Sequence, residues 1–222
     1  LAFAPNGRFL IGGTTAANNG QLISWPMSTE GAGVPRFLQA FGKEREVGMA
    51  AVSFDSTLVA ATEYVGQHVA LFRASPTGEL TKLATMDAPL PQAIAFSADA
   101  RILAVPLAEE KTQLWDIADP QRPVLTGTVP NPGAPASAVA FSPKGHMLAV
   151  GSGSGEVSIW DVENPAAPAK LRSYRDAVAW INMIRFSPDG LMLAASGGDK
   201  YVWVWQVDDQ AETAQLALAT GS

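Results

Sequence analysis

The chain offers few residues whose types and spacing could do chemistry. It has no cysteine, which excludes disulfides, thiolate metal sites and cysteine nucleophiles. Its two histidines, His68 and His146, lie in no recognisable motif, and no G-x-S-x-G elbow precedes a helix. We therefore interpret both histidines as surface or strand-edge residues, and we predict no catalytic residue, no metal site and no cofactor.

Two acidic pairs and one glycine-rich run invite a functional interpretation. Glu109–Glu110 and Asp208–Asp209 are adjacent residues, and adjacent side chains point apart on an extended chain, so neither pair suits general acid/base work. The run Gly151–Gly155 (GSGSG) lacks the Lys-Ser/Thr pair and the helix of a phosphate loop. We interpret the acids as solvated turns and the glycine run as a hairpin turn.

Lys170, Arg172 and Arg175 form a short basic stripe. On an outermost strand such charges discourage edge-to-edge pairing; a docking site for an acidic partner is the alternative. The whole chain is acidic, with a net charge of -6 from 15 Lys+Arg and 21 Asp+Glu. Proteins that follow nucleic-acid phosphates concentrate cations on one face, so we expect no nucleic-acid partner.

The composition predicts a packed domain. Of the 222 residues, 47% are hydrophobic and 16% charged, which is enough to bury a large core. No apolar run approaches the roughly 18 residues that a spanning helix needs, so we expect no membrane insertion. The opening LAFAPNGRFL lacks an initiator methionine and a signal sequence. We expect a cytoplasmic protein whose true N-terminus lies upstream.

Two ladders of aromatic residues run along the chain with the same period. The first ladder is Phe3, Phe54, Phe96, Phe141 and Phe186, with spacings of 51, 42, 45 and 45 residues. The second lies about twenty residues later and consists of Trp25, Phe72, Trp115, Trp160 and Trp205, with spacings of 47, 43, 45 and 45. Two independent ladders with one period indicate a repeat architecture.

Each unit is predicted to form four short strands. The first alternates, and the second is a nearly continuous apolar run such as MLAVGS (147–152), which is typical of a strand buried on both faces. Between them, SPKG (142–145) or SPDG (187–190) predicts a tight turn. The third strand ends at the second aromatic, and a weaker fourth follows. For AETAQLALAT (211–220) the repeat register favours a strand over a helix.

Four-stranded units at this period predict an all-β fold, a β-propeller of four-stranded antiparallel blades with five blades visible. The blades are expected at about 1–49, 50–91, 92–136, 137–181 and 182–222.

The segments VAFSPKGHMLAVGSGSGEVSIWDV (139–162) and IRFSPDGLMLAASGGDKYVWVWQV (184–207) resemble the WD-repeat β-propeller family. The resemblance covers essentially the whole chain and is strongest in the last three units. It is specific for the fold and says little about function, because this family carries many unrelated partners on one scaffold. It implies that Trp25, Trp115, Trp160 and Trp205 form the blade core.

The chain also departs from the family's pattern. The Trp-Asp pair survives only at Trp115–Asp116 and Trp160–Asp161, where the family implies that Asp accepts backbone or turn hydrogen bonds. The Gly-His pair is missing, and the turn Asp six residues before the aromatic is kept only as Asp199. The family's Asp-His-Ser/Thr-Trp network is therefore expected to be incomplete in every blade, and stability to come from apolar packing.

The family's propellers usually close by a strand exchange, whereas this chain begins at an innermost strand and ends after an outermost one, near Thr220. We expect these to be the last five blades of a larger propeller; a small closed ring of five is the alternative. An isolated arc would expose two apolar blade faces and a sheet edge. The resemblance also implies that bacterial relatives commonly form the C-terminal sensor part of a longer chain, after a nucleotide-switch or kinase module.

Two functions are compatible with these features. The first is a non-catalytic scaffold or sensor domain whose partners are proteins or other domains of the same polypeptide. The alternative is a propeller enzyme, lactonase- or hydrolase-like, with a site in the central channel. The innermost strands offer only Asp55 and Arg185 as charges, which makes a poor active site.

A partner is predicted to dock on one rim of the propeller, which carries the turns between second and third strands and the loops between blades. Trp180 fits no repeat position and lies on the connecting segment DAVAW (176–180). An aromatic residue on a connecting loop is typical of an interface. The candidate rim residues are Arg45, Tyr64, Glu110, Lys111, Trp180, Asp199 and Lys200.

Overall fold

The computed structural model describes residues 1–14, 20–41, 45–109, 111–131 and 134–207, and every regular element in them is a strand. The first sheet contains β1 (Ala2–Phe3), β2 (Phe9–Gly13), β3 (Gln21–Ser28), β4 (Gly31–Ala32) and β5 (Arg36–Gln39). The second contains β6 (Val47–Val52), β7 (Leu58–Glu63), β8 (His68–Ala74) and β9 (Leu80–Asp87). The third contains β10 (Ala95–Phe96), β11 (Ile102–Pro106), β12 (Lys111–Asp116) and β13 (Val124–Pro130). The fourth contains β14 (Ala136–Phe141), β15 (Met147–Ser152), β16 (Val157–Asp161) and β17 (Ala169–Tyr174), and the fifth β18 (Ile181–Phe186), β19 (Met192–Gly197) and β20 (Val202–Gln206).

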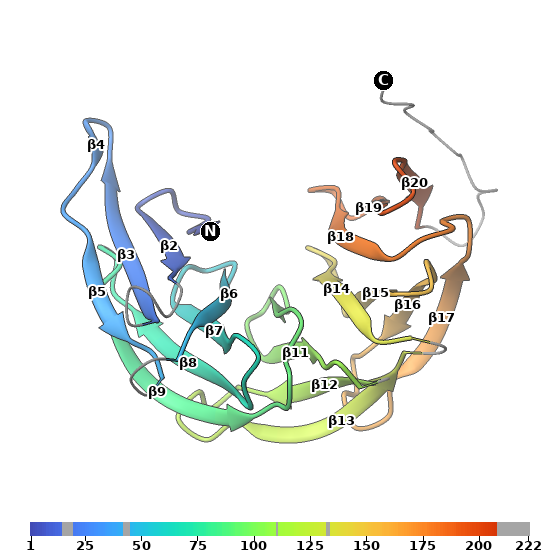
Figure 1. Ribbon diagram of the computed structural model, residues 1–222, viewed down its shortest axis with the longest axis horizontal. Coiled ribbons are helices and arrows are strands. Elements are labelled where there is room, and N and C mark those ends of the chain that lie inside the picture. Colours follow the sequence, from blue (N-terminus) through green and yellow to red (C-terminus); the bar gives the residue numbers. More distant parts are fainter. Residues whose placement is uncertain (15–19, 42–44, 110, 132–133, 208–222) are drawn as a thin grey trace.

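The five antiparallel sheets are the blades of a β-propeller, as the sequence predicts. Within each blade the strands follow one another from the centre outwards, and the blades form an open arc around a central space (Figure 1). In the first blade, β3 continues past the sheet and pairs with β4 in a small added hairpin. The strand predicted at 211–220, and the acidic pair Asp208–Asp209, lie outside the described residues.

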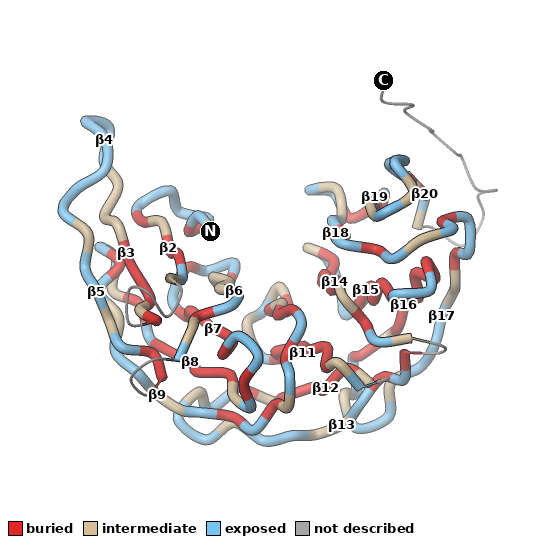
Figure 2. The backbone as a smooth tube through the Cα atoms, viewed as in Figure 1, coloured by how far each residue is buried: buried red, intermediate tan, exposed pale blue. Residues whose placement is uncertain are grey.

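The core consists of four apolar clusters, and each cluster fills the interface between two consecutive blades. Successive strand residues point to opposite faces, so every blade has one face towards the preceding blade and one towards the following blade. The buried residues accordingly follow the second and third strands (Figure 2). The ladder aromatics Phe72, Trp115, Trp160 and Trp205 all pack against the preceding blade and are buried.

Trp25 corrects the prediction that every ladder tryptophan is core. It occupies the same place in the first blade, yet it is only partly buried. Its face is the one that would meet a preceding blade, and in this arc no blade covers that face.

The turns between first and second strands are held by a repeated serine–aspartate contact. In the third blade the Ser97 hydroxyl donates to Asp99 Oδ1 at 2.6 Å, and that oxygen also accepts from the Arg101 N–H at 3.1 Å. Ser97 Oγ accepts from the Ile102 N–H at 2.9 Å. The same contacts recur at Ser53–Asp55 and at Ser187–Asp189. Where the turn has proline and glycine, as at Gly145 and Gly190, the glycine takes the positive φ that the motif predicts.

These contacts make the fold sensitive to acid. Burial alone would raise the pKa of Asp99, but the hydrogen bonds from Ser97 and from the Arg101 N–H outweigh it and lower the pKa. A lowered pKa in the folded state stabilises the fold above the unfolded value of about 3.9, and this stabilisation is lost as pH falls through the folded pKa.

We expect Asp99→Asn to lower the free energy of unfolding at pH 7 by about 0.5–1.5 kcal/mol, because a charge-assisted hydrogen bond becomes a neutral one. The loss should shrink when urea unfolding is repeated at pH 3, where the wild-type carboxylate is itself being protonated. An equal loss at both pH values would contradict this role for the charge.

Candidate interaction surface

The same backbone hydrogen bond recurs in four blades, at the rim where the sequence analysis places the candidate residues. In each case an N–H of the turn between second and third strands donates to a carbonyl of the loop that enters the same blade. The four bonds are Tyr64 N–H to Glu46 O (2.9 Å), Ala108 N–H to Leu90 O (3.0 Å), Gly153 N–H to Pro135 O (2.9 Å) and Gly198 N–H to Trp180 O (3.0 Å). The two kinds of loop therefore share one rim.

This bond also corrects the place of Trp180. Its carbonyl does the same work as those of Leu90 and Pro135, which lie 90 and 45 residues earlier, so Trp180 does occupy a repeat position. The backbone carbonyl at this position accepts the rim hydrogen bond, so the side chain is free to vary from blade to blade. That is why the position is invisible in a comparison of residue types.

The Trp180 side chain is 55% exposed and rests on a neighbouring turn. A Cβ placed on Gly198 would come within 2.8 Å of Trp180 Cε2, so only a glycine lets the indole lie this close to the backbone. Val178 and Tyr201 are also exposed beside it. Together these residues form an apolar patch at the rim of the fifth blade.

Asp199 holds the turn beneath this patch. Its carboxylate accepts from the Trp203 indole at 2.8 Å and from the backbone N–H groups of Tyr201 (3.1 Å) and Val178 (3.4 Å). Burial would raise the pKa of Asp199, but these three donors lower it. Asp199 is therefore a structural anion. Lys200 follows it with a positive φ of 67° at the tip of the turn.

The second blade contributes Arg45 and Tyr64 to the rim. Arg45 forms an ion pair with Glu63, whose nearly buried carboxylate also meets His68 Nδ1 at 2.7 Å and accepts from the Gln67 N–H at 3.1 Å. Burial would raise the pKa of Glu63, but the hydrogen bonds from His68 and Arg45 lower it. Arg45 and His68 thus contact a carboxylate of their own blade, and His68, the first residue of β8, lies at the strand edge that the sequence predicts.

Tyr64 itself is exposed, and so is the next residue, Val65, which no sequence motif marks. Val65 has a φ of 50°, an outlier for a β-branched side chain. Such strain persists only where the surroundings fix the backbone.

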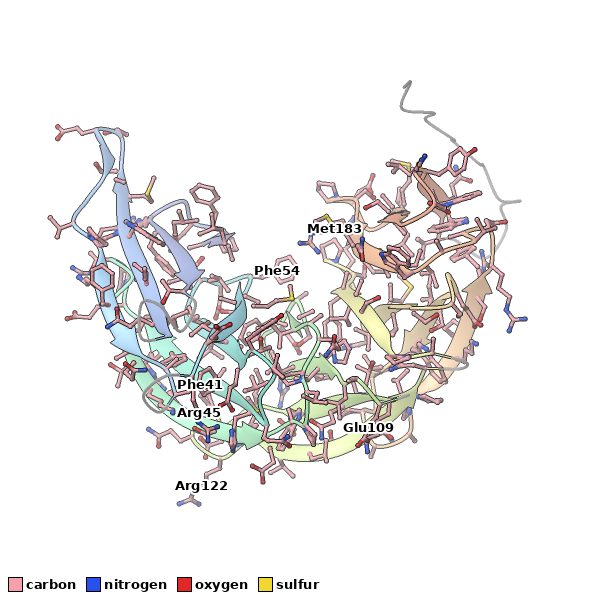
Figure 3. The ribbon with its side chains drawn as sticks, in the orientation of Figure 1. Phe41, Arg45, Phe54, Glu109, Arg122 and Met183 are labelled. Carbon is pink, nitrogen blue, oxygen red and sulfur yellow. The ribbon has the colours of Figure 1, made fainter. Side chains whose placement is uncertain are left out.

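The third blade supplies an ion pair between Lys111 Nζ and Glu109 Oε2 at 2.6 Å, with both side chains well exposed. Glu110 lies outside the described residues. The candidate residues are thus spread over three blades: Arg45 and Glu109 lie on different blades in Figure 3, while Trp180, Asp199 and Lys200 meet on the fifth.

The basic stripe on β17 serves its own blade. Lys170 Nζ contacts Glu156 Oε1 at 2.9 Å, Arg175 Nε donates to Glu156 Oε2 at 3.2 Å, and the Ser173 hydroxyl donates to Oε1 at 2.8 Å. Burial would raise the pKa of the nearly buried Glu156, but Lys170 and Ser173 lower it. Arg172 also interacts within the protein. These contacts favour a structural role for the stripe over a docking site.

The other interpreted residues take structural places. Asp116 accepts from the Ala118 N–H at 2.8 Å and Asp161 from the Glu163 N–H at 2.9 Å, as the resemblance implies. The run Gly151–Gly155 ends the strand β15 and turns into β16, which confirms the hairpin interpretation.

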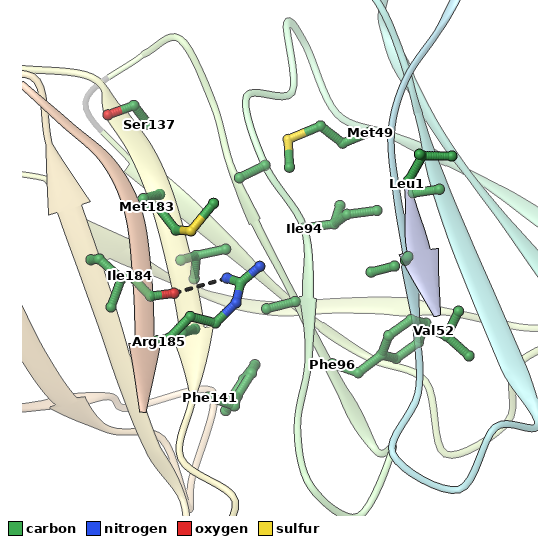
Figure 4. Close-up of a pocket in the computed structure, with 18 of the residues that line it drawn as sticks. Leu1, Met49, Val52, Ile94, Phe96, Ser137, Phe141, Met183, Ile184 and Arg185 are labelled. Atoms are coloured by element: carbon green, nitrogen blue, oxygen red, sulfur yellow. Dashed lines mark hydrogen bonds between the residues drawn. The ribbon is translucent and has the colours of Figure 1, made fainter. Parts of the chain in front are cut away.

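The central space of the arc is a hollow of about 550 Å³, lined by mainly apolar side chains from the innermost strands of all five blades. Phe54 and Met183 point into it in Figure 3, and Figure 4 shows Met49, Ile94 and Met183 along its walls. Arg185 is the one charged residue of this lining, and its guanidinium donates to the Ile184 carbonyl at 2.8 Å. Asp55, expected here, lies instead in the turn after β6.

Metal-binding and membrane-spanning features are both missing from the described residues. No group of three or more His, Cys, Asp or Glu side chains in them is arranged to hold a metal ion. Nor does this part of the chain contain a helix long and apolar enough to cross a membrane.

Two protein-family models match parts of the repeat region. The model of the family "WD domain, G-beta repeat" matches residues 169–206, and that of the "Anaphase-promoting complex subunit 4 WD40 domain" matches residues 118–187. Residues 118–206 therefore carry WD repeats, and the five blades of the described chain have the propeller fold of the WD-repeat family.

A solved structure, the crystal structure of the mitotic checkpoint complex, contains a chain with the same fold. The match has a TM-score of 0.75 at 18% sequence identity and covers 93% of this WD-repeat chain. It covers 61% of the matched chain, so this chain spans less than two thirds of that length. No curated protein matches.

The WD-repeat blades of this chain replace the family's indole network by local partners. The Trp115 indole N–H donates to Gln113 Oε1 and the Trp160 indole N–H to Ser158 Oγ, both at 2.9 Å and two residues earlier on the same strand. The retained turn acid, Asp199, binds Trp203, whereas the ladder residue Trp205 donates to Asp176 at 2.8 Å.

The structural role of the basic stripe can be measured. We expect Lys170→Met to lower the free energy of unfolding by about 1–3 kcal/mol, because it leaves the nearly buried Glu156 with one cation fewer. The control is Arg122→Met, on an exposed turn, which should stay within about 0.5 kcal/mol of wild type in the same urea titration. If the two variants have the same free energy of unfolding, the stripe is better interpreted as a docking site for an acidic partner.

Proposed function

We propose that this chain is a non-catalytic interaction scaffold that holds a protein partner against the rim of turns. The observation that carries the proposal is the repeated backbone bond of the rim, which fixes the loops and leaves their side chains to vary. Loops held by a rigid scaffold are where recognition residues gather. The exposed apolar side chains of this rim are Tyr64, Val65, Leu90, Val178, Trp180 and Tyr201.

The rim's chemistry favours a protein over a charged ligand. Most charged side chains of the rim have partners within the chain. Arg45 pairs with Glu63, Lys111 pairs with Glu109, and Asp199 accepts from three N–H donors. What remains for a partner is aromatic and aliphatic surface, the type of side chain enriched at interface hot spots. The partner is a protein or another domain of the same polypeptide.

The alternative, a propeller enzyme, draws no support from the channel. An active site needs polar groups converging on one place, and the hollow is lined mainly by alanine, valine, isoleucine, methionine and phenylalanine, with Arg185 the one charge. By their printed names, one matching family model and the similar solved structure both describe parts of protein complexes. That supports the scaffold.

Trp180→Ala tests the proposal. We expect the dissociation constant of the partner, recovered by co-purification, to rise about 5- to 150-fold in calorimetric titration, equivalent to about 1–3 kcal/mol. The melting temperature should stay nearly unchanged, because more than half of the indole is exposed.

A matched control is Val124→Ala, which trims an exposed side chain on the outermost strand β13, away from the rim. It should leave both affinity and melting temperature unchanged. Unchanged affinity in Trp180→Ala would reject this rim as the docking surface, and a large fall in its melting temperature would make Trp180 a packing residue.

A further inference from the structure

A second hollow, of about 670 Å³, lies between the second and third blades, and we call it the inter-blade cleft. Its walls are the turns that follow the first strands β6 and β10, together with the end of β8 and the segment after β12. Because the strands of a blade alternate in direction, the cleft lies at the end of the blades opposite to the rim that carries Tyr64 and Trp180. Two arginines, Arg73 and Arg101, line it.

The side chains of these two arginines have no structural task that the described residues show. Both are exposed, and within that part of the chain neither guanidinium has a hydrogen-bond or ion-pair partner. Arg45 and Arg175, by contrast, each bind a carboxylate of their own blade. Arg73 and Arg101 therefore keep their donors available to a ligand.

Arg73 reverses the charge of a repeat position. It pairs with Leu58 across the sheet, as Asp116 pairs with Ile102 and Asp161 with Met147. Those two aspartates accept an N–H of the turn that follows. In the second blade Ser75 holds this turn instead, since its hydroxyl oxygen accepts from the Glu79 N–H at 3.0 Å and its own N–H donates to the Glu79 carbonyl at 2.8 Å. The fold therefore does not require an acid there, and a cation takes its place.

Arg101 lies at a position where only the backbone repeats. Its carbonyl accepts from the Ile117 N–H at 2.8 Å. The same bond recurs in the other four blades, at the carbonyls of Arg8, Thr57, His146 and Leu191. These five side chains differ in chemistry, so the backbone bond does not explain the arginine at 101.

The remaining lining of the cleft suits a carboxylate better than a phosphate. Asp55 and Asp99 also line it, and both are engaged by the serine–aspartate contacts of their turns. Two fixed acids beside two arginines leave no excess of positive charge, which penalises a doubly charged phosphate more than a singly charged carboxylate. Small side chains, Ala74, Ala100 and Ala118, complete the walls and leave room for a peptide backbone.

We propose that the inter-blade cleft binds an acidic peptide segment of a protein partner, with an Asp or Glu carboxylate held by Arg73 and Arg101. Arginine is suited to this task because its planar fork of N–H donors matches the two oxygens of a carboxylate. The site is separate from the rim of turns, so the inference stands whether or not that rim binds a partner.

Fluorescence anisotropy with labelled pools of short peptides tests the proposal. One pool has glutamate fixed at its central position and the other positions randomised, and matched pools carry glutamine or phosphoserine there. We expect the glutamate pool to bind wild-type protein at least about fivefold more tightly than the glutamine pool, because the charge-assisted bonds need a carboxylate. Arg73→Met and Arg101→Met should each remove most of this preference and leave the melting temperature unchanged, since both side chains are exposed.

The matched control is Arg8→Met. Arg8 holds the position of Arg101 in the first blade and is likewise exposed, but it lies outside the cleft, so this variant should bind as wild type does. Trp180→Ala should also leave binding of the glutamate pool unchanged, which separates this site from the rim.

Four outcomes would overturn the proposal. Absent binding, or equal binding of the glutamate and glutamine pools, would show that the cleft does not recognise a carboxylate. An equal loss in Arg8→Met would mean general attraction to positive charge. Tighter binding of the phosphoserine pool would make the ligand a phosphopeptide. A marked fall in the melting temperature of Arg73→Met or Arg101→Met would make that arginine a structural partner of its own blades.

Discussion

A blade of this protein cannot bury its own apolar surface, and the rest of the structure follows from that constraint. In the three middle blades the second and third strands are buried on both sides, so each of these sheets packs between two neighbours. The four apolar clusters of the described chain are four such contacts, and none of them lies within a single blade. The outward faces of the first and last blades carry exposed apolar side chains such as Phe3 and Met192.

This packing does not need the hydrogen-bond network typical of the family. With the Gly-His pair missing and the turn acid largely lost, the indole N–H groups of Trp115 and Trp160 use a side chain two residues earlier on their own strand. A buried N–H without a partner would be costly, so the third and fourth blades satisfy it within one strand, and the fifth uses Asp176 on the loop that enters it. Blades can then differ in their polar residues while keeping the same apolar contacts.

The rim likewise combines repeated backbone contacts with side chains that differ between blades. Backbone bonds that recur from blade to blade fix the turns, and internal ion pairs such as Lys170 and Arg175 with Glu156 neutralise the nearly buried acids. Neither depends on what stands at Leu90, Pro135 or Trp180. Side chains at these positions are therefore open to selection for binding.

The sequence by itself determined the fold, because the aromatic ladders repeat the positions that pack between blades, and packing demands particular residue types. It also predicted the turns, since proline and glycine meet a backbone requirement. Only the tertiary structure showed that Trp180 holds a repeat position, because there a carbonyl repeats and the side chain does not. Only the structure paired Arg45 with Glu63 and Lys170 with Glu156, since strand register and bulges decide which side chains meet across a sheet.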